Sequence, residues 1–245
     1  MQPELQRAID DCYSAFASYP QPRCLDASPL RDPVAILGTL TSAPLRELTG
    51  EQIGPYAGWA MTTVGDIADY KHFLPRILEQ AVRESLWVGT DPPIIASRLI
   101  RGGWLEWPDG ERKAIRALFA GAFSQAIEEH PDQRGDADNW TCGIAILDLD
   151  LPAMLDTWLS TRSMNATLQL ATFLMSTCLF EADPLERAYW SHVDLPAINL
   201  VKRWLLTDRV FQRLSSARGW TAPCDEWLID KALAAQARRR QQVLQ

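Results

Sequence analysis

Asp66, Asp69, His72 and Arg76 are the residues whose types and spacing could form an enzyme site. The last three follow one another at steps of three and four residues, which places them on one face of a helix. Carboxylates work as catalytic acids or bases where a sheltered site shifts their pKa, so this group would need a cavity and further groups from elsewhere in the chain. The alternative interpretation is a solvated polar face that also carries Glu79. We favour the solvated face and keep the enzyme as the second hypothesis.

No pattern for a metal or a cofactor is found in the sequence. His72, His130 and His192 lack the spacing of an H-E-x-x-H or E-x-x-H motif. The five cysteines lie far apart without a C-x-x-C pair, as expected for free or buried thiols. Neither a G-x-S-x-G motif nor a phosphate-binding glycine loop is present, and Gly102-Gly103 is interpreted as a helix stop. We therefore expect no metal and no cofactor.

Charge is unevenly distributed along this chain of net charge −7. Residues 128–156 hold eight acidic residues and one arginine, whereas residues 199–245 hold nine basic and four acidic residues. Charge segregation without a catalytic grouping favours a non-enzymatic protein that binds another protein, for example an immunity or antitoxin-like protein whose acidic patch blocks a basic toxin. The acidic chain as a whole would be repelled by nucleic acid. The predicted partner-binding residues are Glu128, Glu129, Asp132, Asp136 and Asp138.

The basic C-terminal quarter is the second candidate surface. Its densest run is Arg238-Arg239-Arg240. Cations are stabilising at helix C-termini, so we interpret this run as complementing a helix dipole rather than as a phosphate site.

Ten tryptophans are an unusual number for this length. Trp104 and Trp107 flank Leu105-Glu106, and Trp220 and Trp227 bracket Pro223-Cys224. Such pairs could line a groove for a peptide or an apolar ligand. Large rings also fill the gaps between packed helices, and this is the interpretation that we favour.

The helix that would position the first group of residues is predicted from Asp66 onward. Its apolar arc recurs at the helical period and must be buried; it comprises Ile67, Tyr70, Phe73, Leu74, Ile77, Leu78 and Ala81. Its polar arc, which also includes Glu79 and Arg83, is expected to face water or a partner. Asp66 is placed to cap the helix, and Gly65 can take the left-handed conformation that ends the preceding one. Pro75 predicts a kink or a restart.

The same stretch carries a recognisable pattern. Gly65-Asp66, Asp69-Tyr70 and residues 73–79 fit G-D-x-x-D-[FY]-x-x-F-L-P-R-[IL]-L-E. This pattern resembles a signature of a family of uncharacterised bacterial helical proteins, and residues 104–115 resemble a second block of that family. The family has a cysteine-rich segment upstream, whereas only Cys24 stands there in this chain, which argues against a metal role for the region. The resemblance covers about the first half of the chain and implies no activity.

The whole chain is predicted to be an all-α, multi-helix array, in which stacked antiparallel hairpins would suit the short polar turns. Residues 86–88 form the only strand-like run, and residues 131–138 are expected to be an exposed, mobile loop. Besides the pair within residues 55–83, helices are predicted at residues 3–18, 33–40, 44–48, 94–100, 109–129, 139–147, 151–161, 165–181, 185–204, 208–218 and 223–244. The helix over residues 185–204 is expected to break near Pro196.

Length and hydropathy complete the expectations. At 245 residues, one domain spanning residues 1–245 is favoured over two. No charged and then apolar leader is visible, and the most apolar run, at residues 164–180, is short and interrupted by polar residues. We therefore expect a cytoplasmic protein that does not bind a membrane.

Overall fold

The structure is a computed structural model that describes residues 1–84, 89–133, 137–176 and 178–243. Within these ranges the chain forms α-helices and short 3-10 helices, with two isolated β-bridges and no strand. The all-α prediction is confirmed. The strand-like run at residues 86–88 lies outside the described residues. The chain divides into two compact units, residues 1–122 and 123–245. That these form a single domain stays a prediction, as does the stacking of the helices in hairpins.

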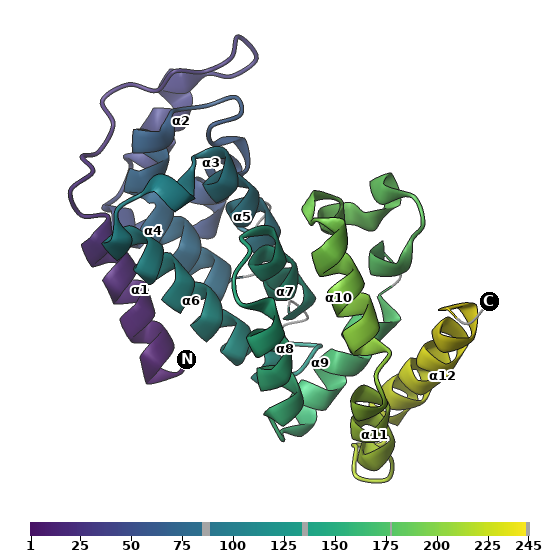
Figure 1. Cartoon of the computed structure of the whole chain (residues 1–245). Helices are drawn as coiled ribbons and strands as arrows, with labels where there is room; N and C mark the ends of the chain where they lie inside the picture. The colour runs from purple at the N-terminus through teal and green to yellow at the C-terminus, as the bar shows by residue number, and fades with distance from the viewer. Residues whose placement is uncertain (85–88, 134–136, 177, 244–245) are drawn as a thin grey trace. The chain divides into compact units, whose positions relative to one another are not determined.

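The first unit is built around α4 (Figure 1). This helix packs against α1, α3 and η1, and α2 packs against α3. The predicted apolar arc of α4 is buried except at its first residue, Ile67, which is exposed. The elements of this unit are α1 (Pro3–Ala15), α2 (Pro33–Leu40), η1 (Leu45–Glu47), α3 (Gly50–Trp59), α4 (Ile67–Arg83), α5 (Pro92–Arg101), η2 (Trp104–Glu106) and the first part of α6 (Asp109–Glu128).

The start of α4 forms as the sequence predicts. The Asp66 carboxylate accepts the Asp69 backbone N–H at 2.9 Å, and the Asp69 carboxylate accepts the Asp66 N–H at 3.0 Å. This reciprocal capping box satisfies two N–H groups that have no partner inside the helix. Gly65 has a φ of 66°, as predicted. It does not end the preceding helix, however, because α3 already ends at Trp59 and a turn separates the two helices.

Of the kink or restart predicted at Pro75, the restart is wrong and the kink stays a prediction. The α4 helix is continuous from Ile67 to Arg83, and Pro75 is buried within it. Proline removes one backbone donor from a helix, at a cost of roughly 3 kcal/mol. Here that cost is offset by the burial of large side chains on both sides of the proline, including Phe73, Leu74, Ile77 and Leu78.

The second unit has α9 at its centre. This helix packs against α7, α11 and α12 (Figure 1). Its Phe173 ring stacks on Trp158 at a centroid distance of 5.7 Å and on Trp190 at 5.9 Å. The elements after α6 are α7 (Ala137–Ile146), α8 (Leu151–Ser160), α9 (Met164–Met175), η3 (Cys178–Phe180), η4 (Pro184–His192), α10 (Leu195–Leu205), α11 (Asp208–Ala217) and α12 (Glu226–Val243).

Two predicted helices of this unit are shorter in the structure. The helix expected over residues 165–181 ends at Met175, and the one expected over residues 185–204 is replaced up to His192 by the 3-10 segment η4. Ala188 interrupts η4 with φ 50° and ψ −128°, and Asp194 then caps α10. The chain therefore breaks just before Pro196, as predicted, because proline fits the first turn of a helix.

Arginines of the basic C-terminal quarter hold the ends of other helices. Arg239 donates to the carbonyls of Leu174 and Ser176 at the end of α9. Arg240 donates to the Leu206 carbonyl at the end of α10, at 2.8 Å. The guanidinium of Arg213 donates to three further carbonyls, those of residues 159, 161 and 163. The interpretation of Arg239 and Arg240 as groups that complement helix C-termini fits, although the ends belong to other helices than their own.

In the described part of the chain, no helix combines the length and the apolar character needed to cross a membrane.

Candidate functional site

The predicted catalytic group on α4 forms a helix cap and hydrogen bonds to backbone carbonyls. Asp66 and Asp69 are engaged in the capping box, and the pKa of Asp69 is raised chiefly by burial. His72 places Nδ1 at 2.9 Å from the Tyr19 carbonyl oxygen. Arg76 donates from Nε to the Leu48 carbonyl at 2.7 Å. These contacts are made with protein groups, and none of the four residues lines a described pocket.

The polar arc of α4 is not a solvated face, so that prediction is wrong. Glu79 is only 6% exposed and accepts hydrogen bonds from the Tyr13 hydroxyl, Arg76 Nη1 and Arg83 Nε at 2.7 to 2.8 Å. Burial acts to raise the pKa of Glu79, but these three hydrogen bonds outweigh it and the pKa is lowered. Glu79 and Arg76 thus form an ionic network that is largely covered, with Tyr13 of α1 as one of its partners, whereas Arg83 at the end of the arc is exposed. The helical period of α4 alone cannot show that cover.

A second buried ion pair in this unit was not predicted. Lys71 Nζ donates to Glu111 Oε2 at 2.7 Å and to the Tyr19 hydroxyl at 2.9 Å, and it lies 4.1 Å from the centroid of the Trp107 ring. The Tyr19 hydroxyl donates to the other Glu111 oxygen at 2.7 Å. No sequence pattern indicates a contact between Lys71 and Glu111, which lie 40 positions apart. Every charge in this group has a partner, which is the arrangement of a structural ion pair.

The predicted partner-binding acids are exposed only in part. Glu128 and Asp132 face solvent, and the Asp132 side chain is 88% exposed. Glu129 and Asp138 are half-buried; a Glu129 oxygen accepts from Gln125 at 2.8 Å. Asp136 lies outside the described residues. The expected loop is shorter than predicted, since residues 131–133 form a turn and α7 begins at Ala137.

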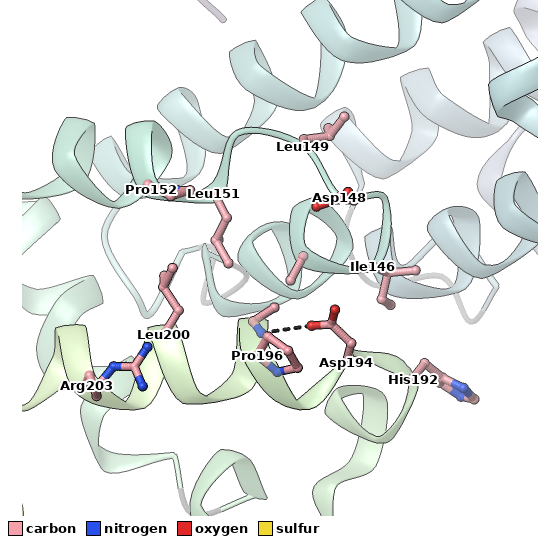
Figure 2. A pocket seen from close by; sticks show the side chains of 12 residues that line it. Ile146, Asp148, Leu149, Leu151, Pro152, His192, Asp194, Pro196, Leu200 and Arg203 are labelled. Carbon is pink, nitrogen blue, oxygen red and sulfur yellow. Dashed lines mark hydrogen bonds between the residues drawn. The ribbon is translucent and has the colours of Figure 1, made fainter.

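A pocket of about 560 Å³ opens between the α7–α8 turn and α10 (Figure 2). Its walls are mainly aliphatic, and Leu151 and Leu200 lie near its middle. The charged residues on its rim are Asp148, Asp194 and Arg203. No sequence motif indicates this pocket, because its two walls come from segments about fifty residues apart.

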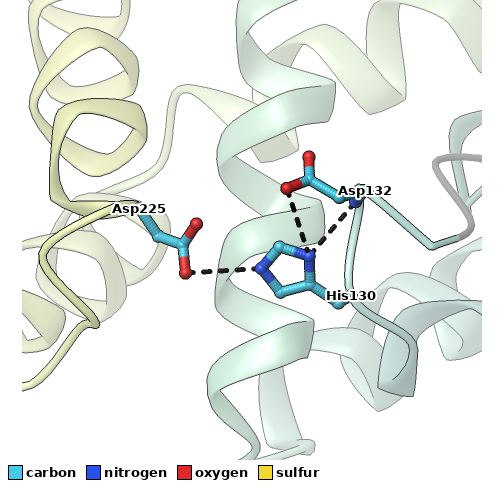
Figure 3. A group of neighbouring side chains, drawn as sticks. All are labelled: His130, Asp132 and Asp225. Atoms are coloured by element: carbon cyan, nitrogen blue, oxygen red, sulfur yellow. Dashed lines mark hydrogen bonds and ion pairs between the residues drawn. The ribbon is translucent and has the colours of Figure 1, made fainter.

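His130 joins the acidic segment to the turn before α12 (Figure 3). Its Nε2 lies 3.3 Å from Asp225 Oδ2, and its Nδ1 lies 3.2 Å from the Asp132 backbone nitrogen. The backbone N–H can only donate, so Nδ1 accepts and Nε2 carries the proton that is donated to Asp225. The imidazole thus links two segments 95 residues apart in sequence.

Two exposed tryptophans flank Asp225. Trp220 is 84% exposed and Trp227 is 53% exposed, so the packing interpretation is wrong for this pair, whereas Trp104 and Trp107 are buried as that interpretation expects. The turn that holds Trp220 is tied to the start of α9 by Thr221, whose hydroxyl contacts Met164 Sδ at 3.7 Å.

The acidic segment is tied to the same end of α9. Asn165 donates to the Glu128 carbonyl at 2.8 Å, and Gln169 donates to that of Glu129 at 2.9 Å. Acidic and aromatic side chains therefore share one region around the start of α9. We call this region the His130 surface; it consists of Glu128, His130, Asp132, Trp220, Asp225 and Trp227.

His130, Asp132 and Asp225 are also the one group of metal-ligand types that lies close together among the described residues, with one potential ligand atom from each within 4.8 Å of the others. A metal ion on Nε2 would need that nitrogen without a proton, yet the Asp132 N–H on Nδ1 places the proton on Nε2. A metal ion on Nδ1 would have to displace this N–H. The observed hydrogen bonds therefore fit a polar link better than a metal centre, and the absence of a metal stays a prediction.

Comparisons of this chain with protein-family models, with curated proteins and with solved structures find no match. The resemblance of residues 65–79 to a bacterial signature therefore stays a prediction.

Proposed function

We propose that this chain is a non-enzymatic, cytoplasmic protein that binds another protein through the His130 surface. The observation that carries the proposal is the exposure of Trp220 and Trp227 beside solvent-facing acids. Tryptophan is enriched among the residues that dominate binding energies at interfaces, and exposing so much apolar ring area to water costs free energy that a partner would recover.

The charge of this surface indicates what the partner presents. Glu128 and Asp132 of this surface are exposed acids, and so is the adjacent Glu226. Two cations lie nearby: Arg218 pairs with Asp230 at 2.7 Å, and Lys231 Nζ lies 4.9 Å from the centroid of the Trp227 ring. A partner with exposed arginines or lysines would meet carboxylates for ion pairs and the exposed Trp220 ring for a cation–π contact. A basic toxin neutralised by an immunity or antitoxin-like protein is one partner of this kind.

The structure of α4 weighs against the enzyme alternative. Asp66 and Asp69 cap the helix, and His72 and Arg76 form hydrogen bonds with backbone carbonyls, so these polar groups already have partners within the protein. All five cysteines are free, which fits a reducing cytoplasm.

The test is affinity capture from a bacterial lysate with quantitative mass spectrometry, comparing the wild type with Trp220→Ala and with the double variant Glu128→Gln/Asp132→Asn. Asp156→Asn is the matched control, because Asp156 is also an exposed acid of this unit but lies outside the His130 surface. We expect a basic protein whose recovery falls about tenfold or more with either surface variant, is unchanged by the control, and falls as salt increases.

The captured protein is then purified and its affinity measured by calorimetry with the same variants. Equal recovery of every protein by the wild type and both surface variants would refute the His130 surface as the binding region. Recovery that depends on Trp220 but not on salt or the acids would refute the basic partner.

A further inference from the structure

The pocket between the α7–α8 turn and α10 has an aliphatic middle and opposite charges at its two ends. Figure 2 shows Leu151 and Leu200 between Arg203 at one end and Asp148 with Asp194 toward the other. Its volume of about 560 Å³ lies within the usual range of ligand sites. All of its lining residues belong to the second unit.

The charged groups at the two ends are available to a ligand. Among the described residues, neither the Asp148 carboxylate nor the Arg203 guanidinium forms a hydrogen bond or an ion pair, although most other arginines of this unit bind carbonyls or carboxylates. Asp194 accepts the Ala197 N–H at 2.8 Å through one oxygen, which leaves its other oxygen for a donor. The C-terminal end of α7 precedes Asp148 and adds partial negative charge at that end of the pocket. The N-terminus of α10 lies at the same end and adds partial positive charge, which the Asp194 carboxylate caps.

Asp148 is held in an unusual backbone conformation. Its φ is 51°, in the left-handed region that few residues other than glycine adopt, although aspartate and asparagine tolerate it. Such conformations persist where the surrounding structure imposes them, and they are concentrated at binding and active sites. Here the left-handed turn brings the carboxylate to the pocket between the buried residues Leu147 and Leu149.

The distance between the charged ends sets the length of the ligand. Asp194 and Arg203 are nine positions apart along α10, a rise of roughly 13 Å, and an arginine side chain leans toward the helix N-terminus, which shortens the span to about 10 Å. An extended peptide covers about 3.3 to 3.6 Å per residue. Three or four residues therefore bridge the two ends.

We propose that this pocket binds a free peptide of three or four residues with apolar side chains, its terminal ammonium at Asp148 and Asp194 and its terminal carboxylate at Arg203. The aliphatic walls receive the side chains between the two charges. This site is separate from the residues of the His130 surface.

The test is isothermal titration calorimetry of the full chain with the tetrapeptide Ala-Leu-Ala-Leu and with its N-acetylated and C-amidated forms. We expect the free peptide to bind and each blocked form to bind about tenfold more weakly, because each loses one charge-assisted contact. Asp148→Asn should weaken the free peptide but leave the acetylated form unchanged. Arg203→Gln should weaken the binding of the free peptide but leave that of the amidated form unchanged.

Asp156→Asn and Arg209→Gln are matched controls, because both residues are exposed on the same unit and lie outside the pocket. Asparagine tolerates the left-handed backbone of Asp148, and Arg203 is exposed, so both test variants should fold; thermal melts verify this. The proposal is overturned if the free peptide gives no binding heat at millimolar concentration, or if blocking either terminus leaves the affinity unchanged.

Discussion

Replacing Glu79 by alanine should strongly destabilise the first unit, although its helical position alone predicts an almost neutral change. The carboxylate accepts three hydrogen bonds from charged or phenolic donors and is 6% exposed. Such bonds are worth roughly 1.5–3 kcal/mol each, but they share one acceptor and are not additive. The governing cost is that of leaving Arg76, whose side chain is also buried, without its counter-charge. We expect a loss of about 3–5 kcal/mol in the free energy of unfolding.

Urea unfolding followed by far-ultraviolet circular dichroism measures this loss. The internal control is Arg83→Ala, which removes a partner whose side chain is 41% exposed and should cost no more than about 1 kcal/mol. The double variant Arg76→Ala/Glu79→Ala should be less destabilised than the sum of the single variants, because neither charge is then left alone. A loss below about 1 kcal/mol for Glu79→Ala would show that the polar arc of α4 is solvated after all.

Three further predictions concern charge, helix ends and thiols. The pKa of Glu79 is lowered in the folded state, so the contribution of its carboxylate to the free energy of unfolding is complete above the ordinary glutamate pKa of about 4.3 and is lost as pH falls through the lowered value. Urea midpoints at acidic pH should therefore fall more for the wild type than for Glu79→Gln. Arg213→Lys should cost about 1–3 kcal/mol in urea unfolding, since an ammonium cannot serve the carbonyls that the guanidinium fork reaches; an unchanged midpoint would contradict this. Burial, with a smaller effect of nearby Asp11, raises the pKa of Cys12 to about 12, so a thiol reagent should label exposed Cys24 and Cys224 rapidly and Cys12 only on unfolding, as peptide mapping would show.

The features that the sequence predicts correctly depend on neighbours along the chain. The capping box of Asp66 and Asp69 is formed by groups three residues apart, and the left-handed Gly65 needs only its own backbone. The apolar arc of α4 is predictable because large apolar side chains that recur at the helical period form one face of the helix, and such a face packs into the core. The helix stop at Gly102-Gly103 is likewise local, with Gly103 at a φ of 65°.

The features that the sequence does not predict depend on partners far away in the chain. Tyr13 reaches Glu79 across 66 residues, and His130 reaches Asp225 across 95. The helical period of α4 predicts a solvated polar face because it carries no information about the side chains that cover Glu79. Residue type predicts a buried position for Trp220 and Trp227 because large rings are usually covered, yet both rings are exposed.

The arginines of α12 affect the order in which the second unit can form during synthesis. The carbonyls at the ends of α9 and α10 receive their hydrogen bonds from Arg239 and Arg240, which the ribosome adds more than thirty residues after Leu206. Until α12 emerges, these helix ends must be hydrated or frayed, and the nascent unit offers loose backbone to proteases. A chain that ends before residue 239 should therefore be cleaved at the ends of α9 and α10, whereas the full chain should be protected at both.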